Sequence, residues 1–289
     1  MDGEIACGIF ELHRPTAKRV PLIVASPHSG SNYPVEFVAA SRLDPLALRR
    51  SEDSFVDELF AAAPRLGAPL LSARFARAYL DVNREPYELD PTMFADPLPN
   101  FVNAVSPRVR MGLGTIARIV ANGEEIYADK LRFSDAQHRI ETLYHPYHQT
   151  LHRLILETEA LFGGYVLVDC HSMPSVAGSI CGSGAADIVL GDCHGTACAP
   201  AIREVARRFF AARGFAVAIN APYAGGYTTE HYGDPPRRRH ALQVEINRAL
   251  YMDERSYRRK PRFARLVADL AELLQQLSRA AEACLTENG

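Results

Sequence analysis

Short apolar runs alternate along this chain with longer stretches in which apolar residues recur every three or four positions. The short runs are rich in Val, Ile and Leu and have the length of buried strands; they comprise residues 21–26, 165–169, 187–191, 215–219 and 241–246. The longer stretches have helical spacing and comprise residues 51–66, 134–161, 197–213 and 260–284. This alternation predicts an α/β fold in which helices flank a mixed, largely parallel sheet.

Residues with special roles mark some of the element ends. Ser51 is the expected N-cap of the helix 51–66, with Glu52 and Asp53 in its first turn, and Gly67 is the expected stop. The last helix, about 260–284, is amphipathic and is expected to pack on the sheet. Because no repeat or linker is visible, residues 1–289 are interpreted as a single domain. The remaining expectations are strands at 69–75 and 78–82 and a hairpin turn at Asn122-Gly123 within an irregular region, 86–130.

The composition argues against several classes of protein. The 289 residues carry a formal net charge of −2, so nucleic-acid binding is not expected. The longest apolar runs have strand length, and the first residues lack the pattern of a signal peptide, so neither a membrane span nor export is expected. A cytoplasmic location is therefore expected, with the six cysteines reduced. They form no CxxC pair, and nothing in the sequence specifies an oligomeric state.

Two histidines follow strand-like runs directly. His28 comes after the strand 21–26, and His171 comes after the strand 165–169. Chemistry in open α/β sheets lies beyond the carboxyl ends of the strands, so the two side chains are candidate zinc ligands. A third ligand is expected from Glu52-Asp53, and Asp169 could orient a histidine. The alternative is that the histidines cap strands by hydrogen bonding and the acids complement the helix dipole.

Candidate substrate-binding residues lie in Tyr79-Leu80-Asp81-Val82-Asn83-Arg84, where alternation places Asp81 and Asn83 on one face. A guanidinium grips a carboxylate through two hydrogen bonds, so Asn83-Arg84 is interpreted as an anion clamp, with Arg77 as a second candidate. The alternative is that Arg84 satisfies a loop or pairs with Glu85.

Glu245 is a carboxylate between Val244 and Ile246 in a strand-like run, which is unusual unless it is paired or functional. Beside a metal it could take a proton from bound water, whereas pairing with Arg248 would make it structural. The Gly-, Tyr- and Thr-rich residues 220–233, with Gly225-Gly226, suit a substrate lid. His148 and His152 lie one helical turn apart and are either a second site or ordinary surface residues.

Six blocks together resemble the N-formylglutamate amidohydrolase family, and they occur in the family's order over most of residues 20–252. The blocks are Ser26-Pro27-His28-Ser29-Gly30, Glu52-Asp53 with Val56-Asp57, Asp81-Val82-Asn83-Arg84, Asp169-Cys170-His171-Ser172-Met173-Pro174, Gly225-Gly226-Tyr227-Thr228 with His231-Tyr232-Gly233, and Gln243-Val244-Glu245. The resemblance implies a zinc-exopeptidase-like (phosphorylase/hydrolase-like) architecture, similar to zinc carboxypeptidases and aspartoacylases.

The resemblance also implies roles for individual residues. One Zn²⁺ per chain would be held by His28, His171 and Asp53, with Glu52 as the alternative to Asp53. Glu245 would be the catalytic base. Substrate binding would fall on Arg77, Asn83, Arg84, Gly226, Tyr227 and His231.

The implied reaction is hydrolysis of an N-formyl or N-acyl amide of a carboxylated amino acid, N-formylglutamate or a similar compound, to an amino acid and a small acid. Residues 96–135 and 191–195 differ from the formylglutamate deformylase of histidine degradation, so fold and chemistry carry over better than the substrate. The alternatives are a deacylase or amidase acting on another N-acyl amino acid or a cell-wall peptide, a non-catalytic protein that binds metal or amino acid, and a thiol hydrolase using Cys170.

Overall fold

The computed structural model describes residues 4–6, 8–178 and 186–286, and its core is an eight-stranded mixed sheet with the order β1-β2-β4-β3-β5-β8-β6-β7. Strands β4, β3, β5 and β8 run parallel to one another, β2 and β6 pair antiparallel with the two edges of this block, and β7 runs parallel to β6. The predicted mixed, largely parallel α/β sheet is therefore confirmed. The strands span Glu4–Ala6 (β1), Phe10–His13 (β2), Leu22–Ser26 (β3), Leu70–Ala73 (β4), Tyr165–Met173 (β5), Ile188–Gly191 (β6), Val217–Ile219 (β7) and Arg239–Asn247 (β8).

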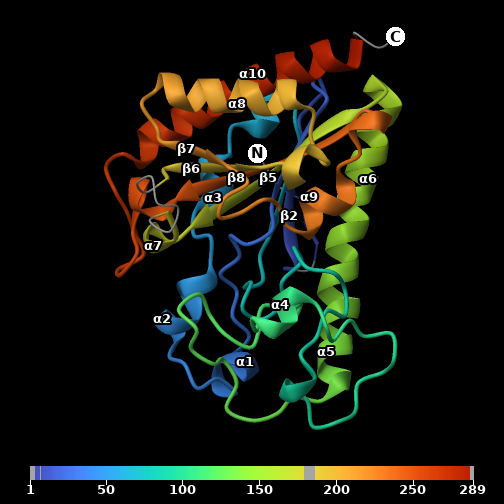
Figure 1. The fold of residues 1–289 in the computed structure, drawn as a ribbon, viewed down its shortest axis with the longest axis vertical. Coiled ribbons are helices and arrows are strands. Elements are labelled where there is room, and N and C mark those ends of the chain that lie inside the picture. The colour runs from blue at the N-terminus through green and yellow to red at the C-terminus, as the bar shows by residue number, and fades with distance from the viewer. Residues whose placement is uncertain (1–3, 7, 179–185, 287–289) are drawn as a thin grey trace.

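The central strands are buried on both faces, which explains their continuous apolar runs. Alternate residues enter two different hydrophobic clusters: Ile23 and Leu167 pack on one face, whereas Val24 and Val168 pack on the other. Helix α6 (His145–Phe162) covers the first face, and α8 (Pro200–Ala212) and α10 (Phe263–Thr286) cover the second. In Figure 1, α8 and α10 lie side by side above the sheet, while α1, α2, α4 and α5 gather in the lower part of the molecule.

The prediction of a continuous helix over residues 51–66 is wrong. The segment divides into a 3₁₀ turn (Arg49–Ser51), the short α3 (Val56–Leu59) and a second 3₁₀ turn (Ala63–Leu66). Ser51 is not an N-cap; it ends the first turn. Phe55 adopts a left-handed conformation with φ of 68°, and the Asp53 N–H donates to the His28 carbonyl at 2.9 Å, so tertiary contacts override helix propensity. Gly67 does stop the last turn, with φ of 91°.

Two other expectations also need correction. Residues 78–82 form turns and irregular backbone, so the expected strand is wrong, although Leu80 and Val82 still enter the core while Asp81 and Asn83 face the site. Strand β5 continues to Met173, so His171 lies within the strand and not beyond its end. The turn at Asn122-Gly123 is present, closed by an isolated antiparallel bridge between Ile119 and Glu125.

Helix α6 continues α5 (Phe133–Arg139) through a π-helical turn, Ile140–Tyr144, so the helix expected over 134–161 is confirmed with a local change of winding.

The other helices are α1 (Val35–Ala39), α2 (Pro45–Leu48), α4 (Pro107–Arg110), α7 (Ser175–Gly178) and α9 (Tyr227–Tyr232). Further 3₁₀ turns span Pro91–Met93, Cys193–Gly195, Pro235–Arg237 and Arg248–Leu250, and β9 (Met252–Asp253) pairs with β10 (Arg258–Arg259). Within the described ranges, no helix combines the length and apolarity that a membrane span requires.

Candidate metal centre and active site

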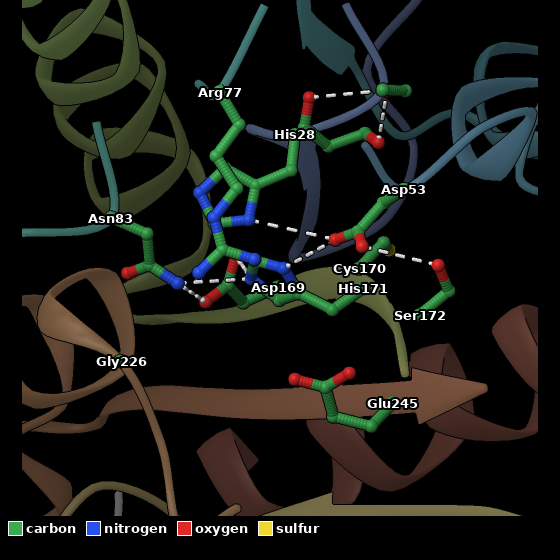
Figure 2. A network of polar contacts seen from close by, with 12 residues as sticks. His28, Asp53, Arg77, Asn83, Asp169, Cys170, His171, Ser172, Gly226 and Glu245 are labelled. Carbon is green, nitrogen blue, oxygen red and sulfur yellow. Dashed lines mark hydrogen bonds and ion pairs between the residues drawn. The ribbon is translucent and has the colours of Figure 1, made fainter. Parts of the chain in front are cut away.

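Two histidines and one aspartate meet at the carboxyl ends of β3 and β5 (Figure 2). His28 follows β3, His171 lies in β5, and Asp53 lies between the first 3₁₀ turn and α3. All three are buried, with exposed fractions of 1%, 3% and 0%, respectively. Asp53 Oδ2 lies 3.5 Å from His28 Nδ1 and 3.0 Å from His171 Nδ1. One ligand atom from each residue lies within 4.8 Å of the others.

The second nitrogen of each histidine faces another carboxylate. His28 Nε2 is 2.7 Å from Asp81 Oδ1, and His171 Nε2 is 3.0 Å from Asp169 Oδ1. Such a carboxylate fixes the ring orientation and raises the basicity of the opposite nitrogen. The sequence suggested this orienting role for Asp169. It did not suggest it for Asp81, although the alternation with Asn83 placed both residues on the same face.

Two observations indicate that these residues could bind a zinc ion. The His28 Nδ1 atom is buried and has no hydrogen-bond partner, which is costly for a polar atom unless something binds it. Two imidazole nitrogens and one carboxylate oxygen are also a donor set typical of a catalytic zinc site. Glu52, the alternative to Asp53, lies in a different network, where its carboxylate accepts hydrogen bonds from Arg49, Tyr33 and Ser54.

Glu245 lies on β8, directly opposite His171 in the parallel register. Its side chain points toward the histidine cluster in Figure 2. Its Oε1 accepts a 2.9 Å hydrogen bond from Gln243 Nε2, and Gln243 Oε1 accepts one from the Gly226 N–H at 2.7 Å. Burial, reinforced by Asp53 and opposed by His171, raises the pKa of Glu245 to about 7. The alternative pairing with Arg248 is absent, since that guanidinium bonds to Asp53, Ser172 and the Arg50 carbonyl.

Arg77 joins the same cluster through Asp81, the carboxylate that also lies against His28 Nε2. Its Nε donates to Asp81 Oδ2 at 3.0 Å, and its side chain is 23% exposed. Burial lowers the pKa of Arg77, but the negative charges of Asp81, Asp53 and Glu245 outweigh this and raise it. A cation is thus held beside three carboxylates and retains some access to solvent.

Asn83 and Arg84 form hydrogen bonds with other groups of the protein. Asn83 Nδ2 lies 2.9 Å from His171 Nε2, and its Oδ1 accepts the Thr228 N–H at 2.7 Å. Arg84 Nε donates to the Leu113 carbonyl and Nη1 to the Asn83 carbonyl, both at 2.8 Å, while Nη2 lies 3.7 Å from Asp81. Two of the three Arg84 nitrogens therefore brace a loop, and among the described residues Nη2 has no hydrogen-bond partner.

The expected lid, 220–233, is partly helical because α9 occupies its second half. Gly226 packs against Asn83 so closely that a Cβ atom there would lie 2.3 Å from Asn83 Nδ2. Tyr227 stacks on His231, with 4.8 Å between ring centroids, at the outer side of α9. Of the predicted substrate-binding residues in this segment, Gly226 thus adjoins the site through Asn83 and Gln243, whereas Tyr227 packs against His148 and His231 is exposed.

Two other sequence hypotheses find no support in the geometry. Helix α6 turns His148 inward, between the Val82 carbonyl and the Tyr232 hydroxyl, whereas His152 is exposed, so the two do not form a site. Cys170 points into the hydrophobic cluster on the face of β5 away from His171, and burial raises the pKa of its thiol well above the usual value. A thiolate nucleophile is therefore disfavoured there.

Comparison with known proteins agrees with these features. The profile described as "FGase: N-formylglutamate amidohydrolase" matches residues 20–252. The N-formylglutamate deformylase of Pseudomonas putida is 28% identical over 82% of this chain and 83% of its own length, and that of Pseudomonas aeruginosa is 29% identical over 90% and 91%. The crystal structure of N-formylglutamate amidohydrolase from Ralstonia eutropha superposes with a TM-score of 0.88 at 37% identity, covering 96% of this chain and 98% of that one. The chain therefore belongs to the N-formylglutamate amidohydrolase family, as its motifs predicted, and is a hydrolase of amide C–N bonds.

Proposed function

We propose that this protein is a zinc-dependent amidohydrolase that removes a formyl group, or another small acyl group, from a carboxylated amino acid such as N-formylglutamate. The observation that carries the proposal is the buried group of His28, Asp53 and His171, with Glu245 on the neighbouring strand. The relatives from both Pseudomonas species are named N-formylglutamate deformylases, which supports formylglutamate as the first substrate to test.

His28 Nδ1, His171 Nδ1 and one oxygen of Asp53 would hold the zinc. When bound, zinc supplies acidification of a water molecule and polarisation of the substrate carbonyl. Asp81 would keep the His28 imidazole oriented for this task, because it lies against the nitrogen that faces away from Asp53, and Asp169 and Asn83 together would do so for His171.

Glu245 is proposed as the general base and then the general acid. Its pKa of about 7 allows it to accept a proton near neutral pH and to return it to the departing amine. Gln243 binds Oε1 of the carboxylate, so Oε2 is the oxygen left to accept the proton. The amine leaves as a neutral group once it has received this proton.

Arg77 and Arg84 are proposed to bind the substrate carboxylate. Arg77 is the stronger candidate because, within the described part of the chain, only its Nε is hydrogen-bonded, to Asp81, which leaves both terminal nitrogens to form a two-point contact. Arg84 would contribute its Nη2. Gly226 would act through Asn83, which fills the space of its missing side chain, and through its hydrogen bond to Gln243, with Tyr227 and His231 farther out on α9.

Formate release from N-formyl-L-glutamate by the purified protein tests this proposal. Activity should be lost on chelation and restored by zinc. N-formylglutamine, N-acetylglutamate and a cell-wall peptide serve as comparison substrates, because they vary the side-chain carboxylate, the acyl group and the size. Preference for another member of this panel would identify a different deacylase. Binding of zinc and ligand without any hydrolysis would instead indicate a non-catalytic binding protein.

A further inference from the structure

The two oxygens of the Asp53 carboxylate have different surroundings. Oδ2 faces the Nδ1 atoms of His28 and His171. Oδ1 accepts two hydrogen bonds, from Arg248 Nη2 at 3.0 Å and from the Ser172 hydroxyl at 3.1 Å. The dashed line from Asp53 to Ser172 in Figure 2 marks the second of these bonds. One oxygen is therefore engaged by the protein, and the other is directed at the candidate metal position.

Arg248 and Ser172 also bind each other, because Arg248 Nε donates to Ser172 Oγ at 3.1 Å. The hydroxyl thus receives one hydrogen bond and passes another to Asp53, so its orientation is fixed. The remaining nitrogen, Nη1, donates to the Arg50 carbonyl at 2.8 Å. The three side chains form a closed ring of hydrogen bonds anchored to the backbone before α3.

A guanidinium in this position requires an explanation, because Arg248 is only 5% exposed and a buried cation is costly unless it is paired. Its only carboxylate partner within hydrogen-bond distance, among the described residues, is Asp53. A carboxylate can bind a metal through one oxygen or through both. Two strong donors on Oδ1 favour binding through Oδ2 alone, since a second metal bond would compete with both of them.

We propose that Arg248 and Ser172 are positioning residues that restrict Asp53 to a single ligand oxygen and so keep one coordination position open for water or the substrate carbonyl. With two histidine nitrogens, one carboxylate oxygen and water or the substrate oxygen, the metal would be four-coordinate, whereas a second carboxylate oxygen would crowd that last position and raise the coordination number to five. This inference rests on the proposed function. It explains how the coordination position for water or the substrate carbonyl is kept accessible.

Cobalt(II) in place of zinc tests the idea without measuring activity, because its visible absorption weakens as the coordination number rises from four to five. The spectra of the wild type, Arg248→Met, Arg248→Lys and Ser172→Ala are compared at full metal occupancy. Arg248→Lys keeps the charge but loses the planar fork. Arg239→Ala is the control, because Arg239 begins β8, the strand that Arg248 directly follows, and pairs with Glu159 away from the site. Circular dichroism checks that each variant is folded.

We expect Arg248→Met to lose visible band intensity, Arg248→Lys and Ser172→Ala to lose less, and Arg239→Ala to match the wild type. If Arg248→Met does not fold, the band intensity of the milder variant Ser172→Ala, compared with that of the wild type, tests the positioning role. Wild-type intensity in all folded variants would overturn the positioning role while leaving the metal site intact. A wild-type protein that binds no metal would instead overturn the proposed function itself.

Discussion

His148 gives the fold a specific sensitivity to acid. Its Nε2 lies 2.8 Å from the Val82 carbonyl, which can only accept, so Nε2 carries the proton and donates. Its Nδ1, 2.9 Å from the Tyr232 hydroxyl, is then the acceptor of the neutral ring. Burial is the main reason that the pKa of His148 falls from 6.5 to about 4. The folded protein therefore holds this histidine neutral under conditions in which an unfolded chain would protonate it.

The sign and size of the effect follow from this difference. Because the unfolded chain takes the proton first, the contribution to stability is fully present above pH 6.5 and is lost as the pH falls toward 4. Each tenfold difference in proton affinity corresponds to about 1.4 kcal/mol, so the complete loss is about 3 kcal/mol. About 2 kcal/mol of this should be lost by pH 5. These values are upper limits, because His148 is half-buried and solvent screens its charge in part.

Urea unfolding of the wild type and His148→Gln at pH 7 and pH 5, with a chelator present, measures this contribution. The variant should be less stable at pH 7 by about 1 kcal/mol for each hydrogen bond that it loses. It lacks the titrating group, so its disadvantage should shrink by up to about 2 kcal/mol at pH 5 and could reverse. A difference in unfolding free energy that is the same at both pH values would refute the argument.

Two further predictions concern the site. His28→Ala and His171→Ala should each lose bound zinc in elemental analysis, whereas Glu52→Ala should retain it, because Glu52 lies in a separate network; zinc loss in Glu52→Ala alone would reverse the assignment. Gly226→Ala should lower the melting temperature and the activity, because its Cβ would meet the Asn83 amide at 2.3 Å, and an unchanged melting temperature would show that the loop moves aside freely.

The secondary-structure elements that depend on local sequence patterns were mostly predictable from the sequence. The buried strands β3, β5 and β8 follow from runs of Val, Ile and Leu, and the long helices follow from their spacing. Convergence of His28 and His171 could be anticipated because His28 directly follows β3 and His171 lies near the end of β5, and these two strands are parallel neighbours.

Features that depend on contacts between distant segments were not predictable in this way. The segment 51–66 has helical spacing, yet it is broken where Asp53 is drawn to His28. Arg248 was expected to pair, if at all, with Glu245, whereas it binds Asp53, 195 positions earlier in the chain. Arg84 has the residue type of an anion clamp, but its partners, the carbonyls of Leu113 and Asn83, carry no signal in the sequence.

The most direct measurement for the proposed chemistry is formate release by Glu245→Gln, with zinc content determined on the same sample. Gln keeps the size of the side chain but cannot accept the proton, and Glu245 is not among the candidate ligands. Zinc should remain bound, and turnover on N-formyl-L-glutamate should fall about 10²–10⁴-fold relative to the wild type. Turnover within a few-fold of the wild type, with zinc retained, would contradict the assignment of Glu245 as the base.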